Sequence, residues 1–205
     1  MLILRPLTAA DNAAAAAVIR TVMPEFGCVG PGYSIEDPEM DDLFGTYSRA
    51  RSGFYVLVNS TALSASRPAP ASEQNSGAAA GAGTVEAGLR PALEQRGEES
   101  APHVPPGTIV GVGGYAPLVG TDGDICELRK MYLLPAARGY GGGRLIMNRC
   151  LAGARADGFT TMYLETVTAM TDAARIYRKY GFEYIDGPLG ATGHSGCDLF
   201  MTRPL

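Results

Sequence analysis

The sequence predicts an α/β (α+β) fold, in which helices flank a central sheet, within one domain spanning residues 1–205. Two observations support this prediction. Stretches typical of strands and stretches with helical periodicity follow one another along the chain, and no internal repeat is found. Near the middle, one strand pattern leads through a glycine-rich turn directly into a helix pattern.

The first 60 residues predict a strand, two helices and a second strand. Apolar and β-branched side chains place the strands at residues 2–5 and 53–59. Thr8 and Asp11 have the spacing of a capping box and begin an alanine-rich helix to about residue 21. Asp37 followed by Pro38 is typical of an N-cap and a first helical residue, which predicts a second helix to about residue 51.

Residues 61–107 break this pattern. The segment is dominated by Ala, Gly, Ser, Pro and Glu, and it contains no aromatic residue, isoleucine or methionine. Such a segment cannot bury enough apolar area to offset the entropy of ordering it. We expect a disordered insertion between the two strands of a hairpin, with at most a short helix near residues 85–96. Without the insertion about 160 residues remain, an ordinary size for one domain.

The second half of the chain continues with five strands and two helices. The strands are expected at residues 108–115, 125–134, 161–167, 182–185 and 198–202. The glycine-rich turn begins the first helix. Thr171 is expected to cap the second helix and Gly181 to end it, with Ala173, Ile176, Tyr177 and Tyr180 on one face.

The glycine-rich turn is expected to bind an anion. Pro135 ends the preceding strand, and glycines at 139 and 141–143 come just before the helix pattern. Unpaired backbone N–H groups and the positive end of the helix dipole converge at such a place. Arg138 and Arg144 add positive charge. We therefore interpret the turn as a phosphate site rather than as a simple connection.

Three kinds of phosphate-binding loop resemble this turn, and the spacing of the glycines and their neighbours distinguishes them. A Walker loop is excluded because Gly143 is not followed by Lys and Ser or Thr. A dinucleotide fingerprint would need a third glycine at Arg144, although Glu165 at the end of the next strand keeps this reading as an alternative. The third pattern, Arg/Gln-x-x-Gly-x-Gly/Ala, is present at Arg138, Gly141 and Gly143.

Together with Tyr-x-x-x-Gly-Phe at residues 177–182, this pattern resembles the GNAT superfamily of acetyl-CoA-dependent N-acetyltransferases. The resemblance covers nearly the whole chain outside residues 61–107. The stretches GGYAPL (113–118), CELRKMYLLP (126–135) and LGATGHSGC (189–197) resemble small bacterial GNAT proteins. The resemblance implies a mixed, mostly antiparallel sheet of about seven strands flanked by four helices, with acetyl-CoA as co-substrate and no metal.

The resemblance also implies which residues bind the cofactor. The glycine-rich loop would take the pyrophosphate, and the strand before it would pair its backbone with pantetheine. The implied residues are Met131, Tyr132, Leu133, Arg138, Gly139, Tyr140, Gly141, Gly142, Gly143 and Arg144. The chain departs from the family at Met170, where many members have an asparagine that contacts the cofactor.

Two residues are candidates for catalysis. Glu127 matches the position from which some family members use a glutamate as general base, and an alkylammonium with a pKa of ~10.4 needs one at neutral pH. The alternative for Glu127 is an ordinary ion pair with Arg129 or Lys130. Tyr177 matches the family tyrosine that protonates the leaving thiolate, although an aromatic residue on an apolar helix face is also typical of core packing.

The acceptor is expected to contact Tyr33, Arg129 and His194. By resemblance, the loop that carries His194 borders the acceptor pocket, where this residue would act as a second base or bind a carboxylate. The first candidate acceptor is a primary amine of a small molecule, such as an amino acid. The alternatives are a protein N-terminus or lysine, and a non-catalytic acyl-CoA-binding module.

The composition of the chain argues against several classes of binding partner. A net charge of −4 argues against a nucleic-acid surface, and no apolar run approaches the ~18 residues that a membrane span needs. Four scattered cysteines and two histidines argue against a metal site. We expect a cytoplasmic protein, and a homodimer is one possible state.

Overall fold

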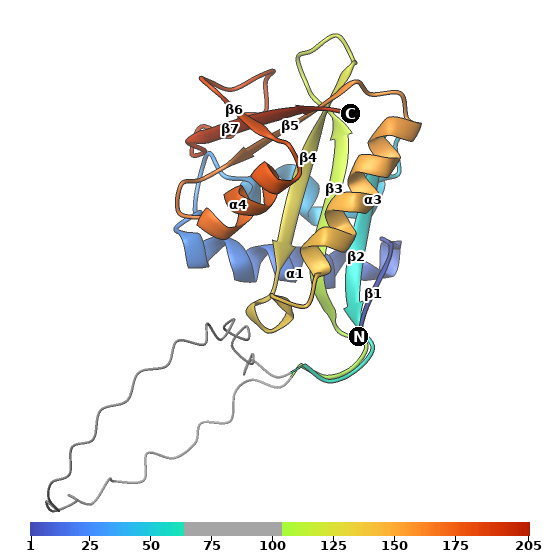
Figure 1. The fold of residues 1–205 in the computed structure, drawn as a ribbon. Coiled ribbons are helices and arrows are strands. Elements are labelled where there is room, and N and C mark those ends of the chain that lie inside the picture. Colours follow the sequence, from blue (N-terminus) through green and yellow to red (C-terminus); the bar gives the residue numbers. More distant parts are fainter. Residues whose placement is uncertain (64–103) are drawn as a thin grey trace, which may run out of the picture.

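The computed structural model describes residues 1–63 and 104–205, which form a seven-stranded sheet with helices on both faces (Figure 1). The strands are β1 (Leu2–Pro6), β2 (Gly53–Asn59), β3 (Ile109–Pro117), β4 (Ile125–Leu133), β5 (Thr161–Thr166), β6 (Glu183–Ile185) and β7 (Leu199–Pro204). Their order in the sheet is β1-β2-β3-β4-β5-β7-β6. Only β4 and β5 pair in parallel. The expected mixed, mostly antiparallel sheet is thereby confirmed.

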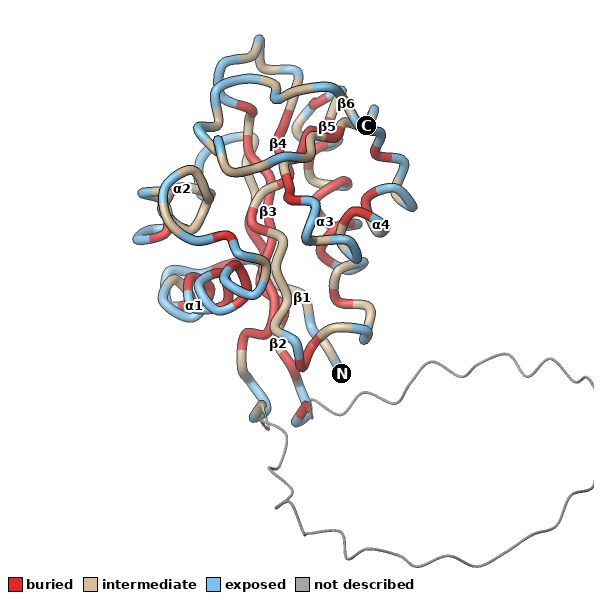
Figure 2. The backbone as a smooth tube through the Cα atoms, turned by 90° about the vertical axis from the view of Figure 1, so that its left-hand side faces the viewer, coloured by how far each residue is buried: buried red, intermediate tan, exposed pale blue. Residues whose placement is uncertain are grey.

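Four helices cover the sheet, as expected. They are α1 (Asn12–Val22), α2 (Leu43–Tyr47), α3 (Gly142–Ala156) and α4 (Thr171–Lys179). Helices α1 and α2 lie on one face, and α3 and α4 lie on the other (Figure 2). Strand β3 is buried along almost its whole length, because helices cover both of its faces.

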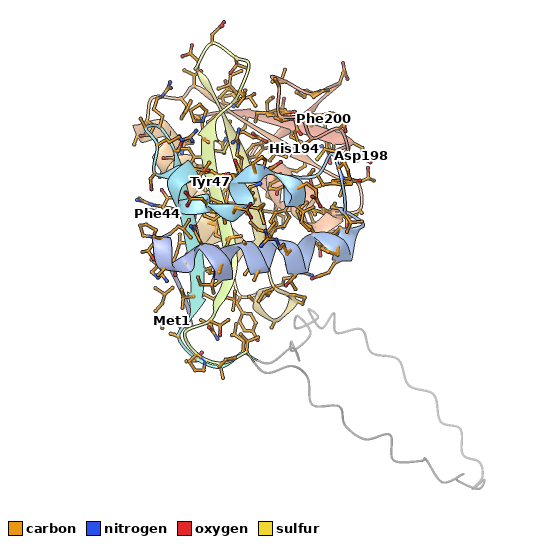
Figure 3. The ribbon with its side chains drawn as sticks, turned by 180° about the vertical axis from the view of Figure 1, so that it is seen from behind. Met1, Phe44, Tyr47, His194, Asp198 and Phe200 are labelled. Carbon is orange, nitrogen blue, oxygen red and sulfur yellow. The ribbon has the colours of Figure 1, made fainter. Side chains whose placement is uncertain are left out.

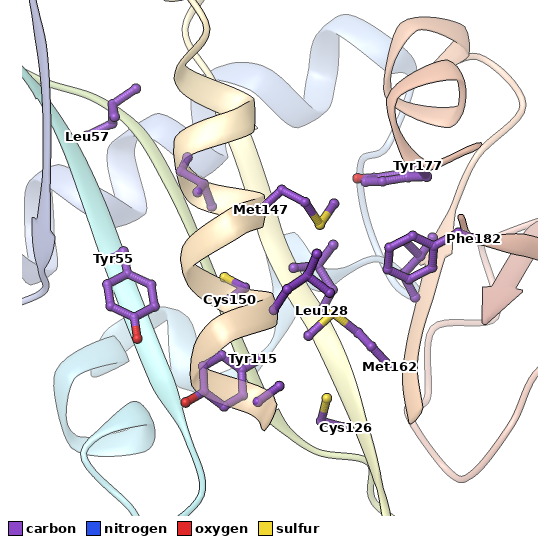
Figure 4. Close-up of a cluster of buried hydrophobic side chains, with 14 of the residues drawn as sticks. Tyr55, Leu57, Tyr115, Cys126, Leu128, Met147, Cys150, Met162, Tyr177 and Phe182 are labelled. Atoms are coloured by element: carbon purple, nitrogen blue, oxygen red, sulfur yellow. The ribbon is translucent and has the colours of Figure 1, made fainter. Parts of the chain in front are cut away.

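The two faces of the sheet carry separate apolar clusters. On the α1 face, Ile19 of α1 and Leu43 of α2 belong to one cluster with Val112 of β3. On the opposite face, Met147 of α3 belongs to a cluster with Phe182, which follows α4 (Figure 4). The alanine-rich helix begins as predicted, because Thr8 and Asp11 form the capping box.

The helix predicted after Asp37 is confirmed only at its start, since Asp37 and Pro38 begin a 3-10 helix but no continuous helix to residue 51 follows, and the cap predicted at Thr171 is wrong. The segment after Asp37 forms a 3-10 turn over Pro38–Asp41 and then only the short α2, whose cap is Asp42, since its Oδ1 accepts a hydrogen bond of 2.9 Å from Gly45 N. The carboxylate of Asp37 is instead bound by Lys130. Thr171 is the first residue of α4 rather than its cap.

The predicted hairpin around the insertion is confirmed, since β2 and β3 pair antiparallel. Its ladder continues to a bridge between Leu63 and Val104, inside the range that we assigned to the insertion. The Asn59 side chain closes this end by donating to Thr61 O and Pro105 O, at 3.1 and 2.8 Å. The predicted disorder and the short helix near residues 85–96 lie outside the described residues.

The sheet opens at its centre, between β4 and β5. Strands β4 and β5 pair over only three residues each, from Ile125 with Thr161 to Glu127 with Tyr163, and then diverge (Figure 1). Beyond Glu127, β4 pairs only with β3. Within this stretch Lys130 has a φ of 52° and the register shifts, which is the geometry of a β-bulge. The edge of β4 that faces β5 is therefore open in the middle of the sheet.

The close approach of β2 and β3 gives a stability prediction. A Cβ atom at Gly114 would lie 2.5 Å from the backbone oxygen of Gly53. Because neither backbone can move aside without breaking the ladder, we expect Gly114→Ala to lower the free energy of unfolding by about 1–3 kcal/mol. Urea unfolding measures this change. Gly187→Ala, whose Cβ would meet nothing within 4 Å, is the control, and equal stability of the two variants would contradict the prediction.

Candidate active site

A cavity of about 260 Å³ lies where β4 and β5 separate. Its walls come from residues 23–39, β4, β5, α4 and the loop 191–197. These segments are far apart in the sequence, and the cavity exists only because the sheet opens between them. A cavity lined by convergent charged groups is a candidate for a binding or catalytic site.

The glycine-rich loop forms the N-terminus of α3. Gly139 and Gly141 have φ values of 81° and 82°, a region that favours glycine. The backbone N–H groups of residues 139–143 donate to no acceptor in the described part of the chain. A Cβ atom at Gly142 would lie 2.4 Å from Leu57 Cδ2, whereas the nearest atom to one at Gly143 is 4.0 Å away. Free donors at a helix N-terminus fit a pyrophosphate.

The predicted cofactor-binding residues line one continuous path. Arg144 is exposed beside Gly141, and Arg138 Nη2 lies 2.9 Å from Glu25 Oε2. Tyr140 is exposed in the loop. The path continues along the open edge of β4, which carries the other three predicted residues, Met131, Tyr132 and Leu133. Of these three side chains, Met131 and Tyr132 line the cavity.

Seven acidic or basic side chains from the described residues line the cavity. The acidic ones are Asp37, Glu39, Glu127 and Glu165, and the basic ones are Arg129, Lys130 and His194. Lys130 is the most buried, with a side chain that is 1% exposed. Its Nζ lies 2.6 Å from Asp37 Oδ2 and 3.1 Å from Glu39 Oε1, and it donates to Ser34 O at 3.1 Å. The bulge in β4 therefore ties the strand to the segment between α1 and α2.

Glu127 is buried beside an arginine. Arg129 Nε donates to Glu127 Oε2 at 2.6 Å, so the alternative that we considered, an ion pair, is present. Arg129 Nη1 also lies 3.7 Å from Glu39 Oε2. Burial raises the pKa of Glu127, although the charges of Arg129 and His194 oppose this effect. A raised pKa brings the carboxylate closer to the range that suits a general base.

His194 is held between carboxylates from three segments. Its Nε2 lies 3.2 Å from both oxygens of Asp37, and its Nδ1 lies 3.4 Å from Glu165 Oε2 and 4.0 Å from Glu127 Oε1. Figure 3 shows this side chain next to the segment between α1 and β2. Burial disfavours the charged ring, but Asp37 and Glu165 outweigh it and raise the pKa of His194 to about 9. The ring is therefore a cation at neutral pH, which favours an electrostatic role over that of a second base.

Glu165 also lines the cavity. From the sequence we considered this residue only as part of a dinucleotide-binding site. Its Oε1 accepts hydrogen bonds from the hydroxyls of Tyr163 and Thr192, at 2.7 and 2.8 Å. Its side chain is 2% exposed. Burial opposes ionisation, but His194 and the two hydroxyl donors outweigh it, so the pKa of Glu165 is lowered. The only signal in the sequence is a carboxylate within the apolar strand TMYLETV.

Tyr177 lies between the core and the cavity. Its ring packs edge-on against Phe182, with centroids 5.9 Å apart, at the margin of the cluster in Figure 4. The residue also lines the cavity, and its hydroxyl has no hydrogen bond to another described residue. Burial raises the pKa of Tyr177 well above its usual value, so the hydroxyl keeps its proton. Tyr33 reaches the same cavity, where its ring packs against Gly196.

Neither a metal site nor a membrane-spanning helix is present in the described residues. Over residues 1–63 and 104–205, no group of His, Cys, Asp and Glu side chains is arranged to hold a metal ion. No helix within these ranges has both the length and the apolar character needed to cross a membrane.

Comparisons with known proteins identify acetyltransferases as the relatives of this chain. The model of the "Acetyltransferase (GNAT) family" matches residues 89–182. The chain is 35% identical over 204 residues to the N-acetyltransferase YjgM of Escherichia coli (strain K12), covering 99% of this chain and 95% of that protein. This relative is matched along nearly its whole length.

Two solved structures share the fold. An acetyltransferase of the GNAT family from Staphylococcus aureus Mu50 has a TM-score of 0.67 at 15% identity, covering 100% of this chain and 99% of that one. A GNAT superfamily phosphinothricin acetyltransferase from Sinorhizobium meliloti, in complex with AcCoA, has a TM-score of 0.62 at 20% identity, covering 100% and 88%. Identities this low support the fold alone.

The environment of His194 predicts how stability depends on pH. The pKa of His194 in the folded protein, about 9, lies above its ordinary value of 6.5. The imidazolium therefore stabilises the fold fully below pH 6.5, and this contribution is lost as the pH rises through 9. We expect the free energy of unfolding to fall by up to about 3 kcal/mol across this window.

Urea unfolding at a series of pH values measures this dependence. His194→Gln should remove the fall. Arg20→Gln should keep it, because Arg20 is an exposed cation whose carboxylate partner, Asp41, is also exposed. A wild-type free energy of unfolding that stays constant across the window would contradict the prediction.

Proposed function

The chain belongs to the GNAT family of acetyltransferases, and from this premise we propose that it transfers an acetyl group from acetyl-CoA directly to a primary amine of a small molecule. The observation that carries the proposal is the open edge of β4. It connects the unpaired N–H groups at the N-terminus of α3 with the cavity that holds Glu127 and Tyr177. One extended ligand can therefore contact these N–H groups and also enter the cavity.

The residues present fit acetyl-CoA, which supplies the activated acetyl thioester when bound. The N–H groups of residues 139–143 would hold the pyrophosphate, and Arg144 would add charge at the same helix end. The backbone of Met131 and the N–H of Leu133 would bond to the pantetheine arm, because Tyr132 pairs with Val112 of β3 and Leu133 O already accepts a hydrogen bond from Arg138 Nε. Met170 at the position of the family asparagine accepts a hydrogen bond from Thr166 at 3.7 Å instead.

Glu127 and Tyr177 would carry out the two proton transfers. Glu127 takes a proton from the acceptor ammonium, directly or through a water, and so frees the nitrogen lone pair for attack on the thioester carbonyl. The new C–N bond forms as the C–S bond breaks. Tyr177 then donates its hydroxyl proton to the departing thiolate. The hydroxyl is free to do so, because it has no hydrogen-bond partner among the described residues.

A small acceptor is favoured by the burial of the charged side chains. Glu127, Glu165 and Lys130 are almost fully buried, and the cavity holds about 260 Å³. Such a volume suits a small amine rather than the surface of a folded protein. A protein acceptor and a non-catalytic acyl-CoA-binding module are outcomes of the tests below. The cytoplasmic location and the homodimer stay predictions.

The role of the glycine-rich loop can be tested by measuring acetyl-CoA binding, without an activity assay. Arg144→Gln should weaken acetyl-CoA binding about three- to tenfold, with less effect at high salt, because it removes an exposed charge beside the expected pyrophosphate. Isothermal titration calorimetry measures the affinity. Arg155→Gln removes an exposed arginine from the other end of α3 and should leave the affinity unchanged. Equal affinities of the two variants would remove Arg144 from the cofactor site.

The catalytic roles can be tested by the rate of CoA thiol release with a panel of amines, polyamines and short peptides. Tyr177→Phe and Glu127→Gln should each lower kcat by about 10²–10⁴ while acetyl-CoA binding is retained. The control for the tyrosine is Tyr180→Phe, which removes only a hydroxyl that donates to Asn148 Oδ1.

The outcomes separate the alternatives. Wild-type activity in both Tyr177→Phe and Glu127→Gln would contradict the proposed roles. Tight acetyl-CoA binding without release from any amine would favour a binding module. No acetyl-CoA binding at all would overturn the proposed function.

A further inference from the structure

One carboxylate oxygen in the cavity is left without a hydrogen bond. Glu165 Oε2 accepts none from the described residues, although its atom is fully buried. The other oxygen of the same carboxylate is held by Tyr163 and Thr192. Tyr163 and Thr192 therefore fix the orientation of the carboxylate, and its second oxygen is buried in the wall of the cavity without a hydrogen-bond donor. Burying a charged acceptor without a donor is costly, so a ligand that donates a hydrogen bond here would be stabilised.

The nearest cation forms an ion pair with this oxygen but no hydrogen bond. His194 Nδ1 lies 3.4 Å from Glu165 Oε2, and its ring is shared with Asp37 on the far side and Glu127 on the near side. The cavity lining holds four carboxylates and only three cationic side chains, even with His194 protonated. The cavity therefore keeps an excess of negative charge that a cationic ligand would neutralise.

The cavity offers no cation to an acceptor carboxylate. Arg129 lies against Glu127 and Glu39, at 2.6 and 3.7 Å. Lys130 is bound on three sides, as described above, and His194 faces Asp37. Every basic side chain that lines the cavity, within the part of the chain that the structure describes, thus already has a carboxylate partner. A ligand carboxylate would have to break one of these pairs or lie beside an unpaired negative charge.

We propose that Glu165 binds the ammonium group of the acceptor, and that the acceptor is a cationic amine without a free carboxylate. This inference rests on the proposed function and names its class of substrate. The two carboxylates stand on opposite sides of the opening, Glu127 on β4 and Glu165 on β5, and both approach the same nitrogen of His194. Glu165 would hold the ammonium, while Glu127 would take the proton. The amino acid that we named as a candidate acceptor would then be a poor one.

Matched pairs of amines test the substrate class. Butane-1,4-diamine and ornithine differ only by a carboxylate, as do 3-methylbutylamine and leucine. In CoA-release assays we expect kcat/KM at least tenfold higher for the member without the carboxylate. Titration of each amine into the protein–CoA complex by calorimetry should show the same order and needs no turnover. Equal values, preference for the carboxylated member, or no binding of either carboxylate-free amine at 10 mM would overturn the inference.

Glu165→Gln tests the residue. The variant keeps the side-chain shape and an oxygen for Tyr163 and Thr192, but it removes the charge. We expect at least a tenfold rise in KM for the preferred amine, with kcat changed less than threefold and acetyl-CoA affinity unchanged. Glu165→Asp should restore part of the loss. Glu183→Gln, which removes an exposed carboxylate on β6, is the control for net charge and should leave KM unchanged.

Failure of this inference can be distinguished from failure of the proposed function. A loss of kcat without a change in KM in Glu165→Gln, or a KM equal to wild type, would overturn the binding role of Glu165 and leave the proposed function standing. Transfer to ornithine or leucine in preference to their partners would likewise leave the transferase activity intact. Absence of acetyl-CoA binding would overturn the proposed function, whereas calorimetric titration of the same amines into the free protein would still decide whether the cavity prefers amines without a carboxylate.

Discussion

The site depends on one feature of the sheet, the end of pairing between β4 and β5 after Glu127 and Tyr163. If the parallel ladder continued, the backbone groups of residues 128–133 would be used within the sheet and no cavity would form. The opening is bordered by β3, which is buried along almost its whole length, and by the apolar cluster of α3. A site for an extended ligand arm is best built on such regular elements.

A network of buried charges holds the opening in shape. Lys130, turned inward by the bulge, binds Asp37 and Glu39 from the segment before α2, and Asp37 in turn binds His194 from the C-terminal loop. Removing one partner of a buried pair typically costs about 3–5 kcal/mol, because the other charge is left uncompensated. The walls of the cavity are thus joined by interactions that are expensive to break singly. The same network leaves Glu165 as the carboxylate with an unsatisfied oxygen.

Local signals in the sequence were sufficient for most elements. The strand at residues 53–59, the capping box at Thr8 and the helix that follows the glycine loop depend on near neighbours, and all three were predicted at their observed places. Asp37 stands at the N-cap position of a 3-10 helix, but its carboxylate does not cap it, because Lys130, 93 residues away, binds that carboxylate. Propensity cannot register a partner at that distance, since it weighs only the backbone next to each side chain.

The sequence by itself therefore determined the fold class, the resemblance to the family, and the loop with its free N–H groups. It also indicated Glu127, Tyr177 and His194, through the family pattern and residue type, but not what surrounds them. Only the tertiary structure decided that Arg129 is paired internally, that His194 is a cation held among carboxylates, and that Glu165 belongs to the site. The reason is physical: a carboxylate's charge state and free oxygens are set by side chains that meet it across the cavity, and the positions of those side chains follow from the separation of β4 and β5.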